Sequence, residues 1–249
     1  MIGNTTSTQQ PRNQHDSEVS LIETMTAKIS HDLSNPMMIF NNVLEIIKNK
    51  NYDCSSHELK KYVEMLETSS FRLNARVRTL AYFNSQRLHI KNESILRIIR
   101  KVVSDLKIPA SVKITLPEND AKIEMDVSQI ETMMIELISN VLQVLSSKGS
   151  IIIRLTENSK DIVLEIENVG DGIPLESLPK LFDPTFLNRK TGSCLGLPAC
   201  KRIIENHDGR ISVDTNPFGM VFTLKLLKKI NVPLNLIPRS SRIPPEEAN

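Results

Sequence analysis

Apolar side chains recur at alternating steps of three and four residues between about residues 18 and 49. This spacing is typical of a helix that packs an apolar stripe against another helix. Pro36 takes the one position that is missing from this stripe. The other stripe positions are Ile22, Met25, Ile29, Leu33, Phe40, Val43 and Ile47. Residues 1–17 are rich in Asn, Gln, Ser and Thr, and we expect them to be disordered.

A second stripe follows a short loop. Ser55 with Glu58 three residues later is a capping box, which predicts a helix start. Two helices of about 30 residues joined by a short loop predict an antiparallel hairpin. The hairpin exposes a stripe that it cannot bury alone, so we expect two copies to pair into a four-helix bundle, as a homodimer. The alternative is that the stripe packs on the rest of the chain. The second stripe contains Leu59, Val63, Leu66, Leu73, Val77 and Leu80, with Ser70 in one slot.

After residue 88 the pattern changes to helices mixed with short strands. The predicted fold class is α+β, with a helical hairpin followed by an α/β sandwich. Four segments follow: a disordered N-terminus (1–17), the hairpin domain (18–87), an α/β domain (88–228) and a flexible tail (229–249). The expected helices cover 94–106, 127–145 and a stretch ending at Ile204, and the expected strands cover 112–116, 150–155, 161–167, 209–214 and 220–226.

Composition narrows the class of protein. A hydrophobic content of 40% with 24% charged residues is ordinary for a globular chain of 249 residues. The net charge of +2 gives no electrostatic case for nucleic acid or a membrane surface. No apolar run approaches the ~18 residues that span a bilayer. The three cysteines lack metal-ligand spacing and predict free thiols in a reducing, cytoplasmic compartment.

The first candidate site is the run from His31 to Pro36. His31 and Asn35 are four residues apart and share a helix face, and Asp32 is close enough to reach the imidazole. A proline inside a helix costs roughly 3 kcal/mol and distorts the preceding turn, which favours a functional role for this turn. The catalytic candidates are therefore His31, Asp32 and Asn35. The alternative is an ordinary surface histidine.

The second candidate site is a polar pair on the helix expected at 127–145. Glu136 and Asn140 are four residues apart and border an apolar face. A carboxylate and an amide oxygen are hard ligands that suit Mg²⁺. The alternative is a pair of solvated surface residues.

The third candidate site is glycine-rich. Six of the eight glycines lie between Gly170 and Gly219. Asn168 to Pro174 follows a predicted strand, and its two glycines predict a tight turn where a ligand can approach the backbone. Arg189 to Leu197 combines cations and glycines with a helix start, which suits a polyphosphate.

These motifs together resemble those of the sensor histidine kinases of two-component systems. The resemblance covers roughly residues 20–228. His31 to Pro36 resembles the phosphoacceptor box, and Phe182 to Phe186 the phenylalanine box. The resemblance implies the Bergerat ATP-binding fold, with ATP and Mg²⁺ as cofactors. The implied metal ligands are Asn140 and Glu136, and the implied nucleotide-binding residues are Asn140, Asn168, Gly170, Gly172, Lys190, Gly192, Leu195 and Gly196.

The resemblance also implies a mechanism and partners. His31 takes the γ-phosphoryl group of ATP, with Asp32 orienting the ring, and passes it to an aspartate of a response regulator receiver domain. Asn35 positions a water that removes phosphate from that receiver. The input signal is expected from an upstream sensor protein or from the short N-terminal segment.

Two departures from the family pattern leave other functions open. Asn168 stands where the family has an aspartate that accepts a hydrogen bond from adenine, and Cys194 stands where it has a glycine. Loss of charge assistance at Asn168 costs roughly fivefold in affinity. The alternatives are a phosphorelay histidine phosphotransferase with a degenerate ATP site, an ATPase in which Glu136 activates water, and a dimeric scaffold without chemistry.

Overall fold

The computed structural model forms two compact units, Met1–Ser69 and Ser70–Asn249. The division between the units falls inside a helix, whereas the sequence predicted a boundary between residues 87 and 88. The structure describes residues 12–49, 56–84, 88–106, 108–145, 148–170, 174–183, 195–216 and 218–230. The expected flexible tail beyond residue 230 lies outside the described residues.

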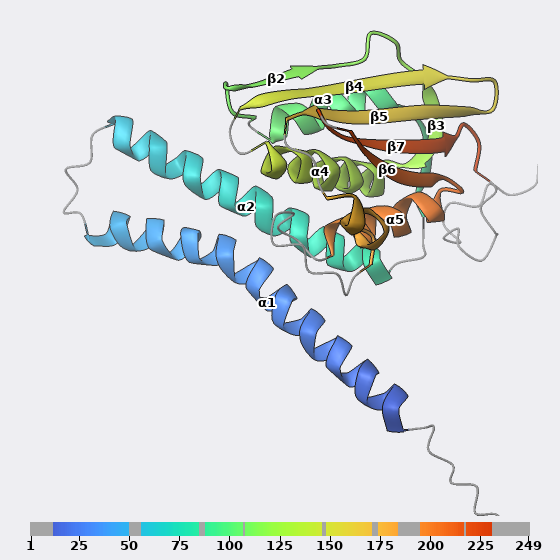
Figure 1. The fold of residues 1–249 in the computed structure, drawn as a ribbon. Helices are drawn as coiled ribbons and strands as arrows, with labels where there is room; N and C mark the ends of the chain where they lie inside the picture. Colours follow the sequence, from blue (N-terminus) through green and yellow to red (C-terminus); the bar gives the residue numbers. More distant parts are fainter. Residues whose placement is uncertain are drawn as a thin grey trace, which may run out of the picture. The chain divides into compact units, whose positions relative to one another are not determined.

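The first unit contains helix α1 (Arg12–Asn49) and the first half of helix α2 (Ser56–Asn84), which run antiparallel (Figure 1). Pro36 lies inside α1 and is buried, and its carbonyl oxygen accepts a hydrogen bond from the Ser69 hydroxyl. Residues 12–17, expected to be disordered, belong to α1. They are polar, so hydrophobic periodicity does not reveal them, and adding a turn to an existing helix costs little.

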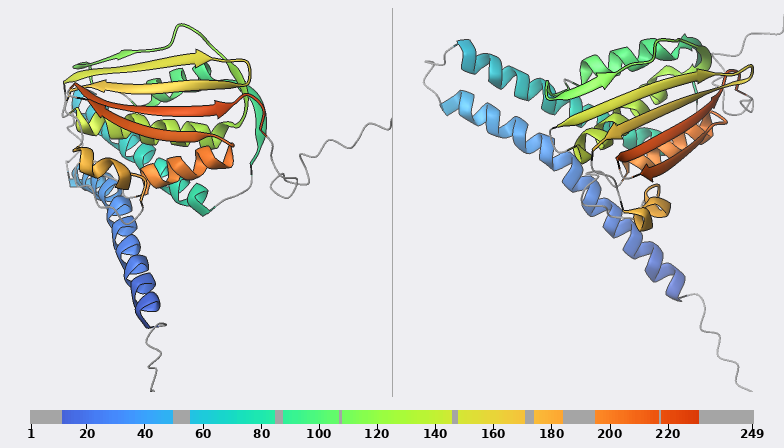
Figure 2. Two further views of the ribbon diagram at one scale, coloured as in Figure 1. Left: turned by 45° about the vertical axis from the view of Figure 1, so that its right-hand side comes forward. Right: turned by 45° about the horizontal axis from the view of Figure 1, so that its top comes forward.

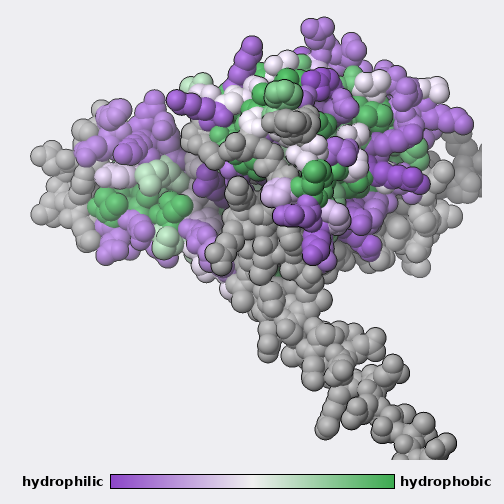
Figure 3. All heavy atoms as spheres, viewed as in Figure 1, coloured by the Kyte–Doolittle hydropathy of each residue, from purple (hydrophilic) through white to green (hydrophobic). Residues whose placement is uncertain are grey.

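Apolar side chains remain exposed on both helices of the first unit. Figure 3 shows them as hydrophobic spheres gathered on the hairpin. Ile47, Leu59 and Val63 belong to the predicted stripes, and their exposed fractions are between 39% and 49%. A contiguous exposed apolar surface typically marks an interaction site, so the homodimer stays a prediction. The exposed apolar residues of this unit include Met37, Met38, Leu44, Ile46, Ile47, Leu59, Val63 and Met65.

The second half of α2 belongs to the second unit. Ala75 is buried in that unit's core, and Phe71 and Tyr82 pack against the core. These residues lie off the predicted stripe, on a different side of the helix. The contacts explain why the compact units divide at Ser69/Ser70 rather than after α2.

The remaining elements of the second unit confirm the predicted mixed sheet. The five-stranded sheet has the order β2-β4-β5-β7-β6, with β2 and β4 parallel and the other neighbours antiparallel. A separate antiparallel pair, β1 with β3, was not predicted. The elements are β1 (Ile90–Ser94), α3 (Ile95–Asp105), β2 (Val112–Thr115), β3 (Lys122–Asp126), α4 (Val127–Val144), β4 (Gly149–Glu157), β5 (Asp161–Val169), η1 (Leu175–Lys180), α5 (Gly196–Asn206), β6 (Arg210–Asn216) and β7 (Gly219–Leu227).

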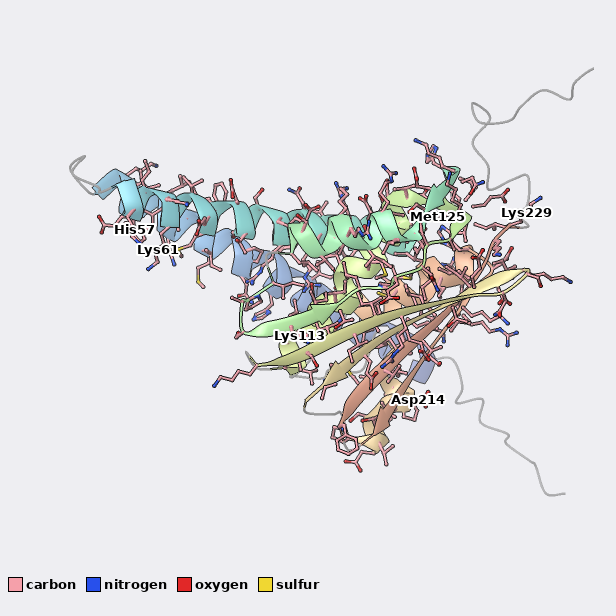
Figure 4. The ribbon with its side chains drawn as sticks, turned by 90° about the horizontal axis from the view of Figure 1, so that it is seen from above. His57, Lys61, Lys113, Met125, Asp214 and Lys229 are labelled. Carbon is pink, nitrogen blue, oxygen red and sulfur yellow. The ribbon has the colours of Figure 1, made fainter. Side chains whose placement is uncertain are left out.

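Helices α3, α4 and α5 lie on one face of the five-stranded sheet (Figure 2). Strand β5 alternates between the two faces, with Ile162, Leu164 and Ile166 buried toward the helices. The same alternation turns Asn168 inward. The other face carries the ion pairs of Arg154 with Glu165 and Glu167 and of Lys225 with Asp161. It extends between the edge strands that carry Lys113 (β2) and Asp214 (β6) (Figure 4). None of the described helices is long and apolar enough to cross a membrane.

A buried polar cluster joins the start of α4 to the end of α5. The Asp126 carboxylate caps α4 by accepting hydrogen bonds from the backbone N–H groups of Ser128 and Gln129 at 3.0 and 3.2 Å. The Asp126 backbone N–H donates to His207 Nε2 at 3.0 Å. His207 Nδ1 lies 2.7 Å from the Ile203 carbonyl oxygen. Because Nε2 accepts, the neutral ring must carry its proton on Nδ1.

Acidification is expected to destabilise the protein through His207. Burial lowers the pKa of His207 below its ordinary 6.5. Below pH 6.5 the unfolded chain therefore binds more protons at this residue than the folded chain does. The free energy of unfolding falls as the pH drops through this window, by at most about 1.4 kcal/mol per pH unit. Urea denaturation at pH 7.5 and pH 5.5 measures this loss, and a His207→Gln variant should lose less. Equal pH dependence in both proteins would contradict the assignment.

Candidate active site

Helix α4 carries the two residues predicted to bind metal. Glu136 and Asn140 are each 2% exposed. The Asn140 Nδ2 group donates to the Glu136 backbone carbonyl at 2.7 Å. This bond fixes the orientation of the amide, so the Asn140 Oδ1 points away from that carbonyl. An amide oxygen held in this way is suited to bind a hard cation.

The Glu136 carboxylate is held by two side chains of α2. Arg76 Nη1 lies 2.9 Å from Oε1 and 2.7 Å from Oε2, and the Thr79 hydroxyl donates to Oε1 at 2.8 Å. Sequence reasoning missed both partners. Its only available signal was that Arg76 and Thr79 lie off the predicted apolar stripe of α2. In this structure Glu136 is therefore the ion-pair partner of Arg76, and its role as a metal ligand stays a prediction.

Asn168 ends the inward-facing series of β5 and is 1% exposed. Its Oδ1 accepts a hydrogen bond from the Met220 backbone N–H at 2.9 Å. This is the oxygen that, by the resemblance to sensor histidine kinases, would accept a hydrogen bond from adenine. Because Oδ1 meets the Met220 donor, the opposite arm of the amide is an NH₂ donor. An aspartate here would offer an acceptor on both arms.

The turn between β6 and β7 packs closely on the end of β5. The Gly170 N–H donates to the Phe218 carbonyl at 2.8 Å. Gly219 has a φ of +152°, and a Cβ there would lie 1.9 Å from the Asn168 carbonyl oxygen. Only glycine therefore fits at this contact. The chain directly after β5 therefore contacts the β6–β7 hairpin beside Asn168.

Helix α5 begins at Gly196, with Leu195 as the N-cap residue, and Leu195 makes no side-chain capping hydrogen bond. This agrees with the helix start expected after the glycine-rich run. Cys200 in the same helix is fully buried, and burial raises the pKa of its thiol well above the usual value, which makes it an unreactive core residue. The predicted nucleotide residues Gly172, Lys190 and Gly192, and also Cys194, lie outside the described residues.

The candidate phosphoacceptor lies in the first unit. His31 and Asn35 are both exposed on α1, one turn apart, and Pro36 follows directly. Asp32 belongs to the same helix, but its side chain lies outside the described residues. The structure therefore confirms that His31 lies on a helix and that its side chain is exposed, whereas its role as phosphoacceptor stays a prediction.

The part of the chain that the structure describes contains no cluster of three or more His, Cys, Asp or Glu side chains that would hold a metal ion alone. A magnesium ion bound at Asn140 would take its remaining ligands from phosphate oxygens and water, as Mg²⁺ commonly does in nucleotide sites. The Asn140 amide fits this arrangement.

Comparison with known proteins identifies the class to which this geometry belongs. Residues 125–230 match the family of histidine kinase-, DNA gyrase B- and HSP90-like ATPases. The chain is 24% identical over 217 residues to sporulation kinase C of Bacillus subtilis, covering 84% of this chain and 50% of that protein. It is 29% identical over 234 residues to the sensory histidine kinase/phosphatase NtrB of Vibrio alginolyticus, covering 87% and 65%. The chain thus spans less than two thirds of the length of either relative.

A solved structure supports the fold. The histidine kinase ThkA, in complex with the response regulator protein TrrA, superposes with a TM-score of 0.58 at 24% identity, covering 90% of this chain and 68% of that one. The mixed sheet with its helices is the Bergerat ATP-binding fold. In sequence and in fold the chain is similar to sensor histidine kinases.

Proposed function

We propose that this protein is an ATP-dependent histidine kinase that phosphorylates His31 and transfers the phosphoryl group to an aspartate of a response regulator. The observation that carries the proposal is the buried Asn140 amide, whose Nδ2 bond to the Glu136 carbonyl leaves Oδ1 on the opposite arm, where it would serve as a cation ligand. An exposed His31 on the same chain supplies the acceptor. ThkA, a structural neighbour, was solved with a response regulator.

The residues divide the reaction between them. Asn140 would hold Mg²⁺, and a bound Mg²⁺ would neutralise charge developing on the phosphates. Asp32 accepts a hydrogen bond from one nitrogen of the His31 ring and orients the other. That nitrogen forms the new N–P bond as the bond to ADP breaks. The nucleotide would be bound by the residues that the resemblance implies, namely Asn168, Gly170, Gly172, Lys190, Gly192, Leu195 and Gly196.

The exposed apolar stripes of the hairpin support a further part of the proposal, which is that two copies of the chain pair. A second copy of the hairpin would cover Ile47, Leu59 and Val63 in a four-helix bundle, giving a homodimer. Asn35, one turn from His31, would position water for dephosphorylation of the response regulator. An upstream sensor protein would supply the signal, and the reaction would take place in the cytoplasm.

One observation favours a second candidate function. The Asn168 Oδ1 is already bonded to the Met220 N–H, so the amide is a poorer acceptor for adenine than an aspartate. A weak ATP site would suit a phosphorelay histidine phosphotransferase, which needs His31 but no nucleotide.

The source of the phosphoryl group separates the two candidates. The purified chain is incubated with γ-labelled ATP and Mg²⁺, and in parallel with a receiver domain carrying labelled aspartyl phosphate. A histidine kinase acquires acid-labile, base-stable label from ATP. Label acquired only from the receiver would identify a phosphotransferase, and phosphate release without protein label would identify an ATPase.

Changing Asn168 to aspartate is expected to tighten ATP binding about fivefold. The aspartate keeps the acceptor used by the Met220 N–H. Its negative charge would strengthen a hydrogen bond accepted from adenine. Isothermal titration of wild type and Asn168→Asp with Mg–ATP measures the change. Weaker binding by a folded variant would contradict the assigned role.

A further inference from the structure

The second half of α2 contacts the candidate active site through the buried carboxylate of Glu136. Arg76 bonds both oxygens of Glu136, at 2.9 and 2.7 Å, and Thr79 bonds one of them at 2.8 Å. Arg76 and Thr79 lie three residues apart and therefore share one face of the helix. All three residues belong to the second compact unit.

Burial makes this ion pair costly to break, because a carboxylate without its partner would stay buried and unpaired. The Glu136 side chain is 3% exposed and the Arg76 side chain 22%. A carboxylate so far from water requires a cation or several donors. One guanidinium nitrogen of Arg76, Nη1, donates to both of its oxygens, and Thr79 supplies the further donor. The three bonds use both carboxylate oxygens, so Glu136 is committed to α2 while they persist.

The same residue stands one turn before Asn140, on the helix that carries the cation ligand. Asn140 bonds the Glu136 backbone, whereas the Glu136 side chain is turned to α2. The local chemistry therefore offers Glu136 two competing cationic partners, the guanidinium of Arg76 and a magnesium ion beside Asn140.

We propose that the second half of α2 is a latch: Arg76 and Thr79 withhold Glu136 from the Mg–nucleotide site, and their release lets Glu136 join Asn140 there. This inference rests on the proposed function, because it needs a nucleotide at Asn140. No atom is transferred; one ion pair is exchanged for another.

Helix α2 is suited to operate such a latch. It is one continuous helix from Ser56 to Asn84, and the compact units divide within it. Its first half belongs to the hairpin and its second half packs through Ala75 on the core of the ATP-binding domain. A signal that rotates or shifts α2 would therefore change the contacts of Arg76 and Thr79 with the Glu136 carboxylate.

The test measures binding of Mg–AMPPNP, a non-hydrolysable ATP analogue, by calorimetry on the full chain. Arg76→Met keeps the length of the side chain and removes its charge. If about a tenth of the wild-type molecules are unlatched, this variant binds about tenfold tighter. The gain should vanish without Mg²⁺ and in the double variant Arg76→Met/Glu136→Gln. Arg78→Met, an exposed arginine on the same helix, is the matched control and should bind like wild type.

Hydrogen exchange gives an independent readout. Adding Mg–AMPPNP to wild type should speed exchange of the backbone amides of residues 73–84, and Arg76→Met should exchange fast without ligand.

Should Arg76→Met fail to fold, Thr79→Val keeps the ion pair and is expected to bind about threefold tighter. Unchanged or weaker binding in the folded variants overturns the latch, and so does absence of binding in every protein. Failure of His31 to acquire phosphate would instead refute the kinase proposal and leave the binding result standing.

Discussion

Replacing Gly219 with alanine is expected to lower the free energy of unfolding by roughly 3–5 kcal/mol, because backbone strain and overpacking add. The alanine Cβ would lie 1.9 Å from the Asn168 carbonyl oxygen and 2.9 Å from its carbonyl carbon. Both atoms are backbone, so they cannot rotate away. The φ of +152° also disfavours any side chain.

The neighbouring Gly170 supplies the control. A Cβ at Gly170 would meet the Leu145 Cδ2 atom at 2.8 Å, the end of a flexible side chain that can move. Gly170→Ala is therefore expected to cost about 1 kcal/mol. Urea denaturation of both variants, followed by circular dichroism, measures the difference. Equal losses would show that the close approach of the β6–β7 turn to Asn168 is not what requires glycine.

Local patterns predicted most of the ATP-binding domain. The alternation of β5 and the apolar periodicity of α4 each place a buried face, and Asn168 and Asn140 continue or border those faces. The pair of strands β1 and β3 escaped prediction. Each has five residues, and the segments IKNES and KIEMD are mostly charged or polar. Their pairing depends on contacts between distant residues and not on a local apolar pattern.

In the candidate site, too, local spacing was visible in the sequence and contacts between distant residues were not. His31, Asn35, Glu136 and Asn140 were recognisable because their spacing matches one helical turn. The Arg76–Glu136 pair was not, because its members are 60 residues apart in the sequence. The hydrogen bond from the Met220 N–H to the Asn168 oxygen was hidden for the same reason, because the partners are 52 positions apart in the sequence. Spacing within one element is visible in a sequence, whereas contacts between elements require the fold.

Changing His31 to glutamine is expected to abolish phosphorylation of the protein. Glutamine is polar and helix-compatible, so α1 should persist. Its carboxamide has no nucleophilic ring nitrogen and forms no phosphoramidate comparable to phosphohistidine. His57, at the start of α2 (Figure 4), is also exposed and provides a matched control. His57→Gln removes a surface imidazole without touching the proposed acceptor.

The most direct test is acid-labile, base-stable label on the wild type, His31→Gln and His57→Gln chains after incubation with γ-labelled ATP and Mg²⁺. We expect label on the wild type and on His57→Gln at comparable levels, and none on His31→Gln. Undiminished label on the folded His31→Gln chain would contradict the account.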